Sequence, residues 1–95
     1  MVVGICRIEL ILHDNRSLKG KRQVVKSLKD KVRGKFNVSV AEVDDLDEWT
    51  RASIGISATG NDRAHVNSVL DNVVNFIEGL HTADLSRHEI EILSI

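Results

Sequence analysis

The sequence predicts a single α+β domain that spans residues 1–95. Ninety-five residues provide enough chain for one small core. Segments with the two-residue apolar period of strands alternate with segments that have the 3.6-residue period of helices, in the order strand, helix, strand, strand, helix, strand. Right-handed crossovers and one buried sheet face then favour a ferredoxin-like βαββαβ sandwich, with an antiparallel sheet in the order 4-1-3-2 and two helices on one face.

The first strand and the first helix follow from these periods. Residues 2–13 alternate, with Cys6, Ile8 and Leu10 on one face and Arg7 and Glu9 on the other. Ser17 is suited to be the N-cap of a helix that begins at Leu18, and Gly34 and Asn37 provide its stop signals. The apolar residues of this helix fall within an arc of about 120°, which predicts a core-facing side: Leu18, Val24, Val25, Leu28, Val32 and Phe36.

The remaining chain predicts a hairpin, a second helix and a last strand. Valines in residues 38–43 and the alternation in residues 51–58 indicate two strands joined by an acidic hairpin. Residues 60–62 form a turn and a cap before a helix over residues 66–80. Residues 79–86 are read as a polar connection, and residues 88–95 as the final strand.

Composition excludes several classes of protein. The chain is 42% apolar and 28% charged and has no proline, so it is neither collagen-like nor disordered. Its single cysteine, Cys6, cannot form an internal disulfide. No stretch approaches the roughly 20 apolar residues of a membrane span. We therefore expect a cytoplasmic protein without a membrane segment.

The net charge of -1 conceals a strong asymmetry. Residues 16–35 hold nine basic groups and one acid, a net +8, while the rest holds four basic and thirteen acidic groups, a net -9. Five of the basic residues project onto an arc of about 80° on the first helix, and we call them the basic stripe: Lys19, Arg22, Lys26, Lys29 and Arg33.

Three interpretations of this charge are open: a solvated or internally paired face, a contact with the RNA backbone, and a contact with an acidic protein partner. The acidic residues of segment 42–48 lie at the same end of the predicted fold as the start of the first helix, so they can neutralise Arg16, Lys19, Lys21 and Arg22 internally. Lys26, Lys29 and Arg33 would then face solvent and contact RNA phosphates. The open sheet face has no aromatic residues on which bases could stack, which excludes the sheet-based mode of RNA binding.

Other candidate sites are weaker. The acidic run lacks the calcium-loop spacing and the four histidines are scattered, so we expect no metal and no cofactor. Cys6 has no histidine nearby in the sequence, so we expect no catalytic residue and no enzyme. Asn61, Asp62 and His65 at the start of the second helix form a candidate anion site, although helix capping explains most of this pattern. Trp49 is either a hydrophobic plug on the hairpin or an interface anchor.

Several stretches resemble the YlxP-like family of small bacterial proteins. They are Val2-Val3-Gly4 with Arg7, Ser17-Leu18-Lys19 with Lys21-Arg22, residues 36–42, Asp47 with Trp49, and Asn61-Asp62 with His65. The resemblance covers about four-fifths of the chain. It implies a ferredoxin-like fold and, because genes of this family commonly lie among those of translation initiation and ribosome maturation factors, work related to the ribosome. Gly20 departs from the polar or acidic helix former expected at that position.

The sequence supports two hypotheses about function. The first is a non-enzymatic binding protein that contacts ribosomal RNA or its assembly factors through the basic stripe. The alternative is a homo-oligomeric interaction module, most simply a dimer, that binds no nucleic acid and packs through its sheet face. Candidate interface residues for the alternative are Ile5, Arg7, Ile11 and Trp49.

Overall fold

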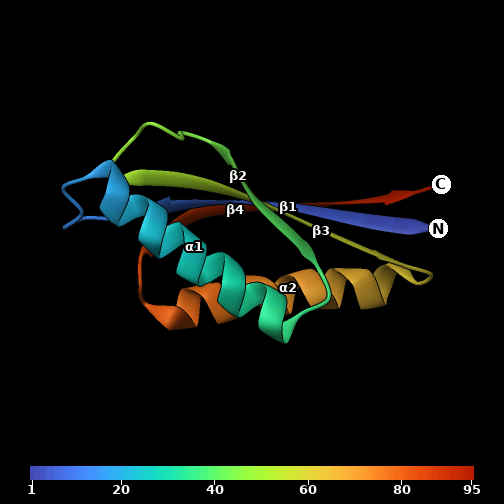
Figure 1. Ribbon diagram of the computed structural model, residues 1–95. Coiled ribbons are helices and arrows are strands. Elements are labelled where there is room, and N and C mark those ends of the chain that lie inside the picture. The colour runs from blue at the N-terminus through green and yellow to red at the C-terminus, as the bar shows by residue number, and fades with distance from the viewer.

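The computed structural model describes residues 1–95 and has the six elements in the predicted order. They are β1 (Val2–Ile11), α1 (Leu18–Lys35), β2 (Ser39–Asp44), β3 (Arg51–Gly60), α2 (Arg63–Leu80) and β4 (Asp84–Ser94). The four strands form one antiparallel sheet in the order β2-β3-β1-β4, and both helices cover the same face of it (Figure 1). The predicted ferredoxin-like sandwich is confirmed.

The core lies between the helices and one face of the sheet. Eighteen apolar residues are buried there, and β1 contributes Cys6, Ile8 and Leu10 from the face that the alternation predicts. Phe36 and Phe76 meet edge to face at 5.6 Å between ring centroids, where the end of α1 meets α2. This packing leaves the other face of the sheet open to solvent.

Two element boundaries differ from the prediction. β4 begins at Asp84, four residues before the predicted start, so the connection after α2 shortens to residues 81–83. The mostly polar segment 84–87 forms an edge strand because it pairs with β1: Leu85 packs against the core, and the register shifts between Glu9 and Leu10, where Ser86 is the extra residue and its hydroxyl donates to the Glu9 carbonyl at 3.2 Å. α1 continues through Gly34 and ends at Lys35.

The two longest loops, residues 12–17 and 45–50, lie at one end of the molecule (Figure 1). The loop before α1 and the loop between β2 and β3 lie together at the end where α1 starts, and both termini lie at the opposite end (Figure 1). The amino terminus donates to the Ile95 carbonyl at 2.7 Å. Neither helix has the length of apolar sequence that crossing a bilayer requires.

Candidate nucleic-acid interface

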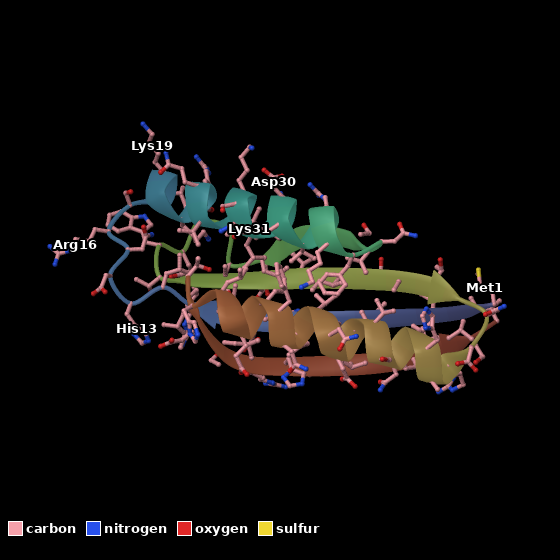
Figure 2. All side chains as sticks on the ribbon, turned by 90° about the horizontal axis from the view of Figure 1, so that it is seen from below. Met1, His13, Arg16, Lys19, Asp30 and Lys31 are labelled. Carbon is pink, nitrogen blue, oxygen red and sulfur yellow. The ribbon has the colours of Figure 1, made fainter.

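The basic stripe lies on the side of α1 that borders the edge strand β2. The face of α1 that packs on the sheet carries Lys21, Val25, Leu28 and Val32, so the stripe occupies a neighbouring side of the helix. Arg33, the last residue of the stripe, shows that this side of α1 faces β2, because its Nη2 donates to the Val40 carbonyl of β2 at 2.8 Å. In Figure 2 the labelled side chains of Arg16 and Lys19 point outward at the end where α1 starts.

Few of these cations have an acidic partner. Lys26 pairs with Asp30 one turn later on the same helix, at 3.1 Å and exposed to solvent. Lys19, Arg22 and Lys29 form no ion pair and no side-chain hydrogen bond. Because an exposed i,i+4 pair contributes only about 0.3–0.5 kcal/mol, the stripe keeps most of its positive field.

The acidic hairpin directs its charges elsewhere. Glu42 Oε2 lies 2.9 Å from Lys21 Nζ inside the fold, and Asp44 Oδ2 accepts a hydrogen bond of 3.0 Å from Arg7 on the open sheet face. Asp45 Oδ2 accepts a hydrogen bond of 3.2 Å from the Ser53 hydroxyl. The prediction that this hairpin neutralises the start of α1 is therefore right for Lys21 and wrong for Arg16, Lys19 and Arg22.

Lys21 is the residue that sequence reasoning misplaced. Its side chain is fully buried, and Nζ donates to the carbonyls of Asp45 at 2.6 Å and Arg51 at 3.1 Å. The spacing contained the signal, because position 21 lies three residues after Leu18 and four before Val25, on the core side of the helix. Lys21 thus belongs to the core and contributes nothing to the basic surface.

The hairpin loop that carries Trp49 is tied to the loop before α1. The Asn15 amide donates to the carbonyls of Ser17, at 2.7 Å, and of Trp49, and the Leu12 N–H donates to the Thr50 carbonyl at 2.8 Å. Gly20 permits this arrangement, because a Cβ there would collide with the Asn15 side chain. Trp49 itself is 54% exposed, so it does not act as a hydrophobic plug.

The candidate interface residues divide between two places. Ile5, Arg7 and Ile11 share the open face of β1, whereas Trp49 lies in the loop just before β3. Arg7 contacts Asp44 at 3.0 Å and Glu9 at 3.9 Å. The backbone N–H of Asp45 and, next, the Arg7 side chain lower the pKa of Asp44 below its ordinary value.

The candidate anion site contains a carboxylate of its own. Asp62 caps α2, and its Oδ2 accepts the His65 N–H at 2.9 Å. Arg63 turns to β4, where it donates to the Ser94 hydroxyl at 2.9 Å and the Ile92 carbonyl at 3.3 Å. Capping thus accounts for Asp62 and His65, and the anion site at Asn61, Asp62 and His65 stays a prediction.

Cys6 lies on the core face of β1 and is buried. Loss of solvation and, secondarily, the Asp71 charge raise the pKa of its thiol to about 11. A thiol with this pKa is almost entirely protonated at neutral pH, so it is a poor nucleophile.

Comparisons with solved structures agree with the fold. The de novo designed protein LFR1 1 with ferredoxin fold aligns with a TM-score of 0.57 at 13% identity, over 100% of this chain and 87% of that one. The de novo designed protein Foldit4 aligns with a TM-score of 0.52 at 15% identity, over 99% of this chain and 97% of that one. At these identities the likeness concerns the fold alone.

Comparisons with known sequences are more specific. The model of the family described as "Protein of unknown function (DUF503)" matches residues 3–90. The "Uncharacterized protein YlxP" of Bacillus subtilis (strain 168) is 39% identical over 77 residues, which are 81% of this chain and 84% of that protein. Both matches agree with the resemblance found in the motifs, and the chain belongs to the DUF503 family of proteins of unknown function and is similar to YlxP.

Proposed function

We propose that this protein is a non-enzymatic, cytoplasmic RNA-binding protein that contacts the phosphate backbone through the basic stripe of α1. The observation that carries the proposal is that Lys19, Arg22 and Lys29 have no acidic partner, although an acidic hairpin lies at the same end of the molecule. Its acids engage Lys21, Arg7 and Ser53. Cations without partners at helical spacing suffice for phosphate contacts of low sequence specificity.

The stripe also has an energetic cost that stability alone does not explain. Arg22 with Lys26, and Lys29 with Arg33, are like-charge i,i+4 pairs, and each destabilises a helix by a few tenths of a kcal/mol. Lys26–Asp30 offsets a part of this repulsion. A polyanion alongside the helix would remove the rest, which is the reason to place the ligand here.

The five members of the stripe contribute unequally in this proposal. Lys19, Arg22 and Lys29 are the primary phosphate contacts. Lys26 joins them by replacing its exposed ion pair with Asp30 by a contact with a phosphate. Arg33 contributes less, because its guanidinium already donates to the Val40 carbonyl. Ribosomal RNA is the first RNA to test, since the resemblance to the YlxP-like family implies work near the ribosome or its assembly factors.

A salt titration tests the proposal. Fluorescent ribosomal RNA fragments are titrated with the wild type and with the triple variant Lys19→Gln, Arg22→Gln, Lys29→Gln at several salt concentrations. Each phosphate contact to a single strand contributes about -0.7 to the slope of log K against log salt, so the variant should have a slope shallower by about 2.

The triple variant is suited to this test because glutamine keeps the helix propensity of the residues it replaces. Circular dichroism and thermal unfolding check that the fold is intact. Binding that does not depend on salt, or that is the same for the folded variant and the wild type, would contradict the proposal.

A further inference from the structure

The open face of the sheet carries a shallow hollow of about 630 Å³. Its floor is made of small residues, Ala41 and Gly55, on the neighbouring strands β2 and β3. The Val43 side chain lies over Gly55, Ile5 rises beside it from β1, and the two are 49% and 40% exposed. A depression and two apolar projections therefore lie next to each other on a solvent-exposed face.

The charged residues of this face are largely paired with one another. Arg7 contacts Asp44 and Glu9, and Arg87 Nη2 contacts Glu89 Oε1 at 2.6 Å. Covering the face therefore removes mostly paired charges from water. The unpaired acid is Glu91, which lies opposite Ile5 on β4.

These features exclude two classes of occupant. A nucleic acid would meet Glu9, Glu89 and Glu91 without an aromatic side chain on which to stack a base. A small polar ligand would find only the Ser39 and Ser57 hydroxyls as free side-chain donors, because the Arg7 guanidinium is already engaged by carboxylates. An apolar protein surface with little net charge fits the face best.

We infer that the occupant is a second copy of this chain, packed face to face through the open sheets about a two-fold axis beside the hollow. Ile5 on β1 is the diagonal neighbour of Gly55 on β3, and the Val43 side chain lies over Gly55, so a two-fold axis between Ile5 and Val43 sets each Ile5 against the Val43 of the other copy. This reciprocal contact is what a two-fold interface requires.

The area of the face agrees with a weak but specific dimer. Four strands at about 4.8 Å spacing, with about nine residues each on average at about 3.3 Å, give roughly 19 by 30 Å, which is about 600 Å² for each copy. Two copies bury about 1,200 Å², at the lower limit of specific interfaces. A contact that covered only part of the face would fall below this limit, so the dimer must bury the whole face.

The dimer is a four-layer sandwich with the helices outside. Because α1 and α2 cover the other face of the sheet, the basic stripes lie on the outer layers and stay accessible. Dimerisation and RNA binding thus use different surfaces, and either can fail without the other.

Sedimentation velocity with matched variants tests the dimer. The wild type is measured from 1 to 200 µM beside Ile5→Glu and Leu46→Glu. Both variants replace an exposed leucine or isoleucine by the same acid, and Leu46 lies in the hairpin loop outside the hollow. We expect a concentration-dependent dimer for the wild type and Leu46→Glu, and a dissociation constant raised by about 100-fold or more for Ile5→Glu, since the variant removes the apolar contact and places a second unpaired carboxylate beside Glu91 in each copy.

Chemical crosslinking checks the geometry independently. Ser57 lines the hollow, and Ser27 lies exposed on α1. Ser57→Cys and Ser27→Cys each add one accessible thiol to a chain whose own cysteine, Cys6, is buried. Packed sheets are about 10 Å apart, too far for a direct disulfide, so a short bismaleimide is used. We expect a covalent dimer from Ser57→Cys alone. A wild type that is monomeric at 200 µM, or a dimer that survives Ile5→Glu and is not crosslinked through residue 57, would overturn the inference.

Discussion

Lys21 shows how one residue can hold two distant segments together. A buried ammonium costs several kcal/mol in lost solvation unless oxygen atoms replace the water. Here the Asp45 and Arg51 carbonyls and the Glu42 carboxylate surround Nζ. These groups lie on both sides of the hairpin loop, so α1 fixes the ends of the loop. Asp45 adopts the left-handed conformation there, with φ 59°.

Replacing Lys21 by methionine should destabilise the protein strongly. Methionine matches the length of the lysine stem but leaves two carbonyls and a poorly solvated carboxylate without the ammonium. We expect the Lys21→Met variant to lose about 3 kcal/mol or more of its free energy of unfolding, measured by urea denaturation. The double variant Lys21→Met, Glu42→Gln should regain part of that loss. An unchanged unfolding midpoint for Lys21→Met would show that the buried ion pair does not hold the loop.

Asp44 contributes to the dependence of the free energy of unfolding on pH in the acid range. The folded protein lowers the pKa of Asp44 below its ordinary 3.8, first through the Asp45 N–H and then through Arg7. The contribution is therefore present above about pH 3.8 and is lost as pH falls through the lower folded value.

The variant Asp44→Asn should consequently lose less stability between pH 5 and pH 2 than the wild type does. Urea midpoints across this range measure the effect. Asp47→Asn is the matched control, because Asp47 lies in the loop that directly follows Asp44 at the end of β2 and has no ion pair or side-chain hydrogen bond. Parallel pH curves for the wild type and Asp44→Asn would contradict the assignment.

At the scale of elements, sequence periodicity predicted which faces of the strands and helices are buried. The alternation of β1 and the apolar side of α1 identified the core faces, because burial selects for those periods directly. The start of β4 was missed because Leu85 is the only apolar residue among its first four, and an edge strand tolerates polar residues since it pairs on one side only.

The site was only partly predictable for a related reason. The grouping of five cations on one side of α1 follows from helix geometry alone. Which acids reach them depends on the path of the hairpin, which the sequence does not encode locally. Glu42 turns inward to Lys21 and Asp44 turns to Arg7 on the opposite face of the sheet. The exposure of Trp49 likewise depends on the tie between Asn15 and the hairpin loop.

At the scale of the molecule, two surfaces of different chemistry lie on opposite sides. The helical layer carries the positive charge of residues 16–35, apart from the buried Lys21, and the open sheet face carries small and apolar residues with paired charges. A net charge of -1 therefore describes neither surface. This separation lets one small domain bind a polyanion and associate with itself through independent contacts.

The most direct test of the central claim compares charge reversals at two lysines of α1. Lys29 belongs to the basic stripe, and Lys31 lies about 160° around the helix from the centre of the stripe. Lys29→Glu and Lys31→Glu have the same net charge, so any difference in their affinity for a ribosomal RNA fragment reflects position. We predict that Lys29→Glu weakens binding by at least about tenfold more than Lys31→Glu at low salt. Equal affinities for the two variants would contradict an interface on this side of α1.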